Sequence, residues 1–141
     1  LGSKIAKSLK NSKFEIIIVD YDEDNYNKAI LDGYNTFNKD LLEDEELIEI
    51  GIESNVKAFY CVSDSSNNNF FVTLSARSLN QKLKIIAKAG SKEDSKKMSL
   101  AGATKVINPT PLETPNSGAF IYFPSISQHL LCRVCNLAKL P

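Results

Sequence analysis

Short apolar runs alternate with longer stretches of helical period along the first 109 residues of the chain. Runs rich in β-branched residues predict strands at residues 16–19, 34–37, 58–62, 83–87 and 105–107. Apolar positions three and four apart predict helices at residues 3–9, 25–31, 43–50, 69–79 and 91–101. This alternation is typical of βαβ units around a parallel sheet, so we expect an α/β fold.

Polar residues and glycines mark the ends of the predicted helices. The asparagines at 67–69 could cap the helix that follows them, and Ser91 with Asp94 resembles a capping box. Gly51 and Gly102 fall where a glycine commonly ends a helix. The helix boundaries are therefore predicted by local chemistry as well as by periodicity.

The character of the chain changes after Pro109. Residues 110–124 carry prolines, a glycine and small polar residues, which predicts a linker or exposed loop. Residues 125–141 have an apolar stripe at helical spacing, with Ser125 and Gln128 as a possible capping box. We expect three parts: a lobe over 1–109, the linker, and a peripheral amphipathic helix that packs between subunits or domains.

Composition narrows the class of protein. The 141 residues suffice for one domain, and 17 basic residues balance 17 acidic ones, so nucleic acid is not an expected partner. Three cysteines, one of them inside an apolar run, make a disulfide framework unexpected and favour a reducing cytosol. No apolar run approaches the roughly 20 residues that span a bilayer. The chain begins at Leu1 rather than methionine, and we expect it to be part of a longer protein.

Gly2 and Asp20 have the spacing of a dinucleotide-binding turn. In such folds, glycines let the backbone approach a pyrophosphate at a helix N-terminus, and an acid about 20 residues on binds the ribose. Gly2 suits the last glycine of GxGxxG, with the first strand and the earlier glycines upstream of Leu1. The alternative is a solvated turn between strand and helix, with Asp22 or Asp24 as its N-cap.

Four segments read together resemble a known family. They are GSKIAKSL…FEIIIVDYDED, GYNTFNKDLLEDEELIEIGI, AFYCVSDSSNNNFFVTLSARSLN and KLKIIAKA…LAGATKVINP. They resemble the nucleotide-binding lobe of the RCK family, the regulators of potassium conductance that include the TrkA-type subunits of potassium uptake systems. The resemblance covers residues 1–109 and implies a Rossmann-like parallel sheet with flanking helices and a first strand truncated here.

The resemblance assigns ligand-binding roles in the first half of the chain. Gly2 matches the third glycine of the phosphate loop, and Asp20 matches the ribose acid, with Tyr21 beside it. Asp40 and Leu41 lie in the loop that borders the adenine.

Further roles fall on the second half. Ser63 and Asp64 match the polar turn that faces the phosphates and the second ribose, and Asn69 matches an asparagine that opens the next helix. Arg77 matches the arginine that ends that helix. Lys88 stands where the family often has an arginine, near the ligand phosphates or a partner subunit.

Two positions depart from the family pattern. Lys39 replaces a glycine, which requires a backbone without positive φ at that point. Lys88 replaces an arginine and cannot make the planar two-point contact of a guanidinium with a phosphate.

Two metal-binding hypotheses are weaker than their alternatives. Some members of the family bind calcium, and acids are available at Asp40, Glu43 and Asp44, but acids at a helix start also favour the helix dipole. His129, Cys132 and Cys135 form H-x2-C-x2-C in the tail. A structural zinc needs four ligands, and Cys61 belongs to a predicted central strand, so packing is the better interpretation of the tail.

The resemblance implies a cytosolic regulatory domain at the inner face of the membrane. It would bind an adenine nucleotide, NAD/NADH or ATP/ADP, form a homo-oligomer such as a dimer or gating ring, and act on a potassium-conducting pore. No nucleophile and base stand out in the sequence, so we do not expect an enzyme. A fragment of an NAD-dependent oxidoreductase and an assembly module without ligand remain alternatives.

Overall fold

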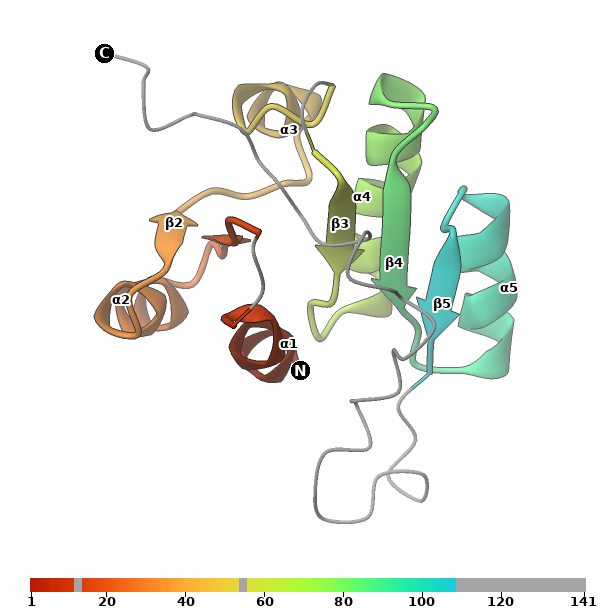
Figure 1. Ribbon diagram of the computed structural model, residues 1–141. Coiled ribbons are helices and arrows are strands. Elements are labelled where there is room, and N and C mark those ends of the chain that lie inside the picture. Colours follow the sequence, from red (N-terminus) through yellow and green to blue (C-terminus); the bar gives the residue numbers. More distant parts are fainter. Residues whose placement is uncertain (12–13, 54–55, 109–141) are drawn as a thin grey trace.

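The fold was analysed in a computed structural model that describes residues 1–11, 14–53 and 56–108 (Figure 1). Its helices and strands follow in the order α1 (Gly2–Leu9), β1 (Ile17–Val19), α2 (Glu23–Leu31), β2 (Asn35–Phe37), α3 (Asp44–Glu49), β3 (Ala58–Cys61), α4 (Ser66–Leu79), β4 (Lys84–Lys88), α5 (Lys92–Leu100) and β5 (Lys105–Ile107). The predicted alternation is confirmed. The predicted linker at 110–124 and the predicted helix at 125–141, with His129, Cys132 and Cys135, lie outside the described residues.

The strands form two parallel sheets. β1 pairs with β2 in the register Ile18 to Thr36, and β4 pairs with both β3 and β5. In the Rossmann order, a first strand would lie between the strands that are β1 and β3 here. The two described sheets are separate at that place.

Side chains just before the first turn cap the N-termini of α2, α4 and α5. Asp22 accepts a hydrogen bond from the backbone N–H of Asn25, which places the cap of α2 on one of the two acids considered above. Ser91 accepts from the N–H of Asp94 at 3.0 Å, as the capping-box spacing predicts.

The start of α4 differs from the prediction. The asparagines at 67–69 were predicted to cap this helix, but α4 begins at Ser66 and all three lie inside it. Ser65 is the N-cap, and its hydroxyl accepts from the N–H of Asn68. Because the hydroxyl of Ser65 caps α4, the side chains of the three asparagines are not needed for capping.

Glycines with positive φ follow three of the helices. Gly51 (φ 81°) and Gly102 (φ 104°) end α3 and α5 as predicted, and Gly33 (φ 82°) does the same after α2. A residue with a Cβ is strained in this left-handed region, so glycine allows the chain to turn toward the next strand.

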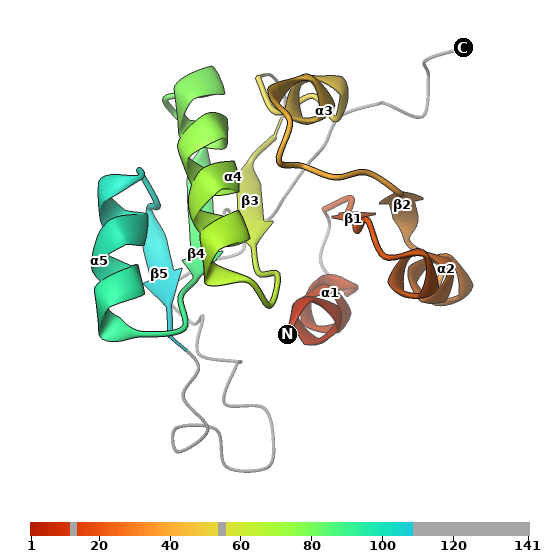
Figure 2. The ribbon, with the colours of Figure 1, turned by 180° about the vertical axis from the view of Figure 1, so that it is seen from behind.

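The core lies mainly beneath the second sheet. Figures 1 and 2 show α4 and α5 against the same face of β3, β4 and β5. Ile85, Ala76 and Met98 are almost completely buried between these layers. Val19 and Phe37, from the first sheet, are only partly buried and pack against this core. No helix in the described ranges is both long and apolar enough to cross a bilayer.

Candidate functional site

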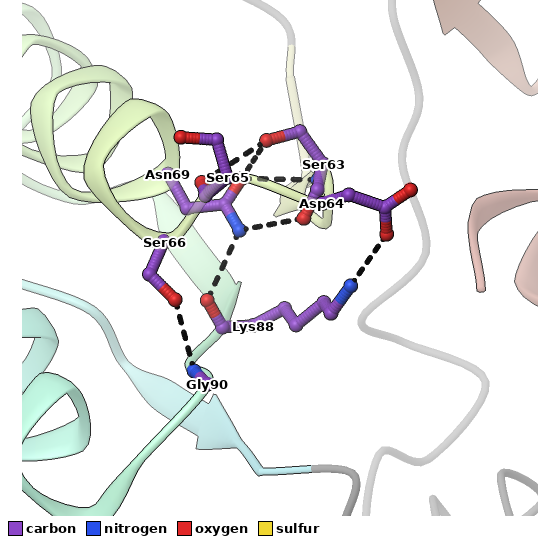
Figure 3. Close-up of polar contacts among 7 residues, drawn as sticks. All are labelled: Ser63, Asp64, Ser65, Ser66, Asn69, Lys88 and Gly90. Atoms are coloured by element: carbon purple, nitrogen blue, oxygen red, sulfur yellow. Dashed lines mark hydrogen bonds and ion pairs between the residues drawn. The ribbon is translucent and has the colours of Figure 1, made fainter.

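Four of the predicted ligand-binding residues meet where β3 and β4 end. Ser63 and Asp64 follow β3, Asn69 lies in the first half of α4, and Lys88 is the last residue of β4 (Figure 3). The carboxyl ends of neighbouring parallel strands are the usual ligand-binding edge of an open α/β sheet. The fold therefore brings together residues that are up to 25 positions apart in the sequence.

Asn69 organises this group from a buried position. Its side-chain oxygen accepts from the N–H of Ser63 at 3.0 Å and from the hydroxyl of Ser63 at 2.8 Å. Its side-chain nitrogen donates to the carbonyls of Ser63 at 3.0 Å and Lys88 at 3.1 Å. These four bonds use the full capacity of the amide, and the residue is only 3% exposed. Asn69 thus holds the β3–α4 turn against the end of β4.

Lys88 and Asp64 form an ion pair across the same edge. The ammonium nitrogen lies 2.7 Å from a carboxylate oxygen of Asp64, as Figure 3 shows. The hydrogen bond from Lys88 lowers the pKa of Asp64 below its usual value. The lysine side chain is 19% exposed, whereas the Asp64 side chain is fully exposed. The pair therefore fixes the ammonium group of Lys88 at the strand ends, beside a counter-ion that stands in the solvent.

A further hydrogen bond supports the turn after β4. The hydroxyl of Ser66 accepts from the N–H of Gly90 at 3.0 Å. A Cβ at Gly90 would lie 2.9 Å from that same hydroxyl oxygen, so glycine permits the close approach. Neither Ser65 nor Ser66 was predicted from the sequence, although serines between a strand and a helix are a recognisable signal of such contacts.

Asp20 and Tyr21 lie at the corresponding ends of the first sheet. The Asp20 carboxylate accepts from the N–H of Asp22 at 2.9 Å, in an Asx turn that leads into α2. Asn38, which the sequence analysis also missed, donates to the carbonyls of Asp20 and Tyr21. The bonds from Asn38 join the loop after β1 to the loop after β2. Tyr21 itself is exposed.

Asp40 and Leu41 lie in the loop after β2, where Lys39 has partners on α3. The Asp40 carboxylate accepts from the N–H of Leu42 at 3.2 Å. Lys39 contacts the carboxylates of Glu46 at 2.5 Å and Glu49 at 2.6 Å. The hydrogen bond to Glu46 raises the pKa of Lys39 most, and the hydrogen bond to Glu49 raises it further. Lys39 stands where the family pattern has a glycine, and its ion pairs join the loop after β2 to α3.

Gly2 begins α1 beside the end of β3. A Cβ at Gly2 would be 3.7 Å from the side chain of Val62, an ordinary contact distance, so packing does not require glycine there. The helix has no side-chain cap. Gly2 is thus close to the Ser63 group, whereas Asp20 and Asp40 belong to the other sheet.

Arg77 forms hydrogen bonds within the fold, and Cys61 is buried in it. Arg77 donates from Nε and Nη2 to the carbonyl of Gly102 and from Nη1 to the carbonyl of Gln81. It therefore joins the end of α4 to the turn after α5. Burial raises the pKa of the Cys61 thiol to about 12, in keeping with the predicted buried thiol.

A pocket of about 300 Å³ lies over α4 and α5 rather than at the predicted site. Its lining includes Phe70, Phe71 and Met98. None of the nine predicted ligand-binding residues lines it, so it does not mark the nucleotide site. Within the described ranges, no group of three histidine, cysteine or acidic residues could hold a metal ion.

Comparison with known proteins identifies relatives of the sequence. The family model of the TrkA-N domain matches residues 1–109. Potassium channel protein 1 of Methanocaldococcus jannaschii is 32% identical over 111 residues, which are 77% of this chain and 33% of that protein. The chain spans about a third or less of the length of the curated relatives it matches.

Solved structures resemble the fold. The TrkA-N domain of the inner membrane protein ybaL from Escherichia coli has a TM-score of 0.71 at 18% identity, covering 77% of this chain and 79% of that one. A GsuK channel bound to NAD has a TM-score of 0.68 at 19% identity, covering 75% and 19%. At these identities the likeness concerns the fold, and it agrees with a Rossmann-like arrangement.

Proposed function

This chain belongs to the TrkA-N domain family, and we propose that it is a regulatory lobe that binds an adenine nucleotide and controls a potassium channel or uptake system. The observation that carries the proposal is the convergence of Ser63, Asn69 and Lys88 at the carboxyl ends of adjacent parallel strands. At this edge the ammonium group of Lys88 is the group that can recognise a phosphate, and the hydrogen bonds of Asn69 to Ser63 and to the carbonyl of Lys88 hold the edge together.

Within this site, Asp20 would bind the ribose and Lys88 a phosphate. The Asx turn uses one oxygen of the Asp20 carboxylate, and a carboxylate can accept several hydrogen bonds, so capacity remains for ribose hydroxyls. Tyr21, Asp40 and Leu41 would border the base, and Gly2 would face the phosphates from α1. Asn69 would act by positioning Ser63 and Lys88. The NAD bound by GsuK supports a nucleotide of this class.

Regulation would follow from a difference in affinity between two states of an assembly. A ligand shifts a conformational equilibrium only by the difference in its binding free energy to the two states. No hydrolysis is needed, and the potassium channel relatives support a regulatory rather than an enzymatic role. The lobe would lie on the cytoplasmic side of the membrane and act on a pore in the same or another polypeptide.

Self-association would use the surface of α4. Phe71 is 56% exposed and Leu74 is 47% exposed, and they lie three positions apart on one face of the helix. Phe71 also lines the pocket shared with Met98 of α5. An exposed apolar face of this kind favours association with another protein surface, here a second copy of the chain.

A second candidate function is an assembly module without ligand. The ion pairs of Lys88 with Asp64 and of Lys39 with Glu46 favour it, because both lysines already have acidic partners. Ligand binding separates the two candidates.

The test is isothermal titration calorimetry on the full-length protein with NAD, NADH, ATP, ADP and AMP. The regulatory proposal expects saturable binding of at least one nucleotide, and absence of binding by all five would leave the assembly module as the function.

The Asp20→Ala variant tests the predicted ribose contact. Each charge-assisted hydrogen bond contributes roughly 1.5–3 kcal/mol, so we expect binding to weaken about 10- to 150-fold. Asp24→Ala is the matched control, because Asp24 is an exposed acid in the first turn of the adjoining helix. Equal affinities of the Asp20 variant and the unmodified protein would remove Asp20 from the site.

A further inference from the structure

The ion pair between Asp64 and Lys88 is unequal in its exposure. The two charged groups are 2.7 Å apart, yet the lysine side chain is 19% exposed and the aspartate side chain is fully exposed. The cation is therefore held against the protein, whereas its counter-ion stands in the solvent. Of the two, the carboxylate is the group that can leave without opening the packed structure.

The backbone on both sides of the pair is held by other bonds. The carbonyl of Lys88 accepts from the buried side chain of Asn69 at 3.1 Å. Asp64 lies between Ser63, which is bonded to the same amide, and Ser65, which caps α4. A rearrangement at this edge would therefore be confined to the two charged side chains.

A phosphate can replace a carboxylate as the partner of an ammonium group. Both present anionic oxygens at hydrogen-bonding distance, and a nucleotide phosphate offers more acceptor oxygens. An exposed ion pair is worth little in water, so breaking it opposes ligand binding only weakly. The released Asp64 side chain is already fully exposed and can turn away from the phosphate.

We propose that Asp64 occupies the position of a ligand phosphate and that nucleotide binding displaces it from Lys88. This inference rests on the proposed nucleotide-binding function. It adds that the Asp64 carboxylate competes with the ligand phosphate for Lys88. Asp64 then lowers the affinity for phosphate-bearing ligands and leaves the affinity for a nucleoside unchanged. A direct contact of Asp64 with a ligand ribose, as the family resemblance implies, has the opposite effect, because its removal would weaken binding.

The sign of the effect of Asp64→Asn decides between these two roles. We expect titration calorimetry of the full-length protein to show ADP and NAD binding roughly 2- to 5-fold tighter in this variant, the range that an exposed ion pair contributes. Adenosine should bind equally to both proteins. Weaker or unchanged binding of ADP and NAD would overturn the proposal.

Two further variants make the test specific. Glu53→Gln removes one negative charge from an exposed position before β3, at the opposite ends of the strands, and should leave all affinities unchanged. Lys88→Gln should weaken binding of ADP and NAD, and adding Asp64→Asn to it should change nothing more. If Asp64→Asn still tightened nucleotide binding in the Lys88→Gln background, Asp64 would not compete with the phosphate for Lys88. If the unmodified protein binds no nucleotide, it is the proposed function that fails.

Discussion

At the scale of single residues, the buried amide of Asn69 holds the turn after β3 against the end of β4. Its four hydrogen bonds join the backbone of Ser63 to the carbonyl of Lys88. The family resemblance matches it to the asparagine that opens the helix after β3, and in the structure it lies in the first half of α4. Only the folded structure shows that its polar atoms are already used, which assigns it a positioning role in our proposal.

Replacing Asn69 with leucine should destabilise the domain by about 2–4 kcal/mol. The substitution retains the size of the side chain but leaves part-buried donors and acceptors of Ser63 and Lys88 without their partner, each at an appreciable cost. Urea denaturation would measure the loss. Asn67→Leu is the control, since Asn67 is exposed on the same helix and should change the stability by less than about 0.5 kcal/mol. Equal losses in the two variants would contradict the role of Asn69.

The partners of Lys39 and Lys88 could not be predicted from either residue alone. Both residues depart from the family pattern. For Lys39, the sequence predicts only that the backbone has no positive φ at that position. In the structure it joins Glu46 and Glu49 on α3, seven and ten positions further along the chain. A side chain's partner depends on which elements pack beside it, and no local pattern contains that information.

At the scale of elements, the helix boundaries at Gly51, Gly102 and Ser91 were predicted accurately, whereas the start of α4 was not. The glycines at the ends of α3 and α5 have the expected positive φ, and Ser91 caps α5. The start of α4 was predicted at residue 69 and lies at Ser66, because the hydroxyl of Ser65 caps the helix first. Several adjacent polar residues were capable of capping, so spacing alone did not select among them.

Gly102→Ala should destabilise the fold more than Gly33→Ala. Both glycines have positive φ, so each substitution strains the backbone by roughly 1 kcal/mol. A Cβ at Gly102 would also lie 2.5 Å from Cγ of Arg77, whereas a Cβ at Gly33 would meet nothing within 4 Å. Thermal unfolding of the two variants gives the comparison. If Gly33→Ala were as harmful, the contact with Arg77 would not matter for stability.

At the scale of the whole molecule, the second sheet carries most of the packing. β4 lies between β3 and β5 with α4 and α5 on one face, whereas the strands of the first sheet are only half-buried. The proposed ligand residues are divided between the two sheets, so their geometry depends on how the halves are held together. The nucleotide binding that we propose would contribute to holding the two halves together.

Phe71→Glu should weaken self-association without unfolding the protein. The side chain is more than half exposed, so a charge there costs little in the monomer and much in an apolar contact. Light scattering after size-exclusion chromatography would detect a smaller assembly. Leu31→Glu is the matched control because Leu31 is 87% exposed on α2, which packs on the first sheet, whereas α4 packs on the second (Figure 1). An unchanged mass for Phe71→Glu would exclude this face of α4.

The sequence by itself determined the class of fold, the order of the strands and helices, and the family to which residues 1–109 belong. Periodicity, caps and turn glycines are properties of neighbouring residues and predicted the fold and its elements, whereas the family followed from the resemblance of four segments. The tertiary structure alone decided that Asn69 is saturated, that Asp64 meets Lys88 across 24 positions, and that the sheet is divided between β1 and β3. These features arise from contacts between distant segments, whose energies depend on distance and burial in the folded chain.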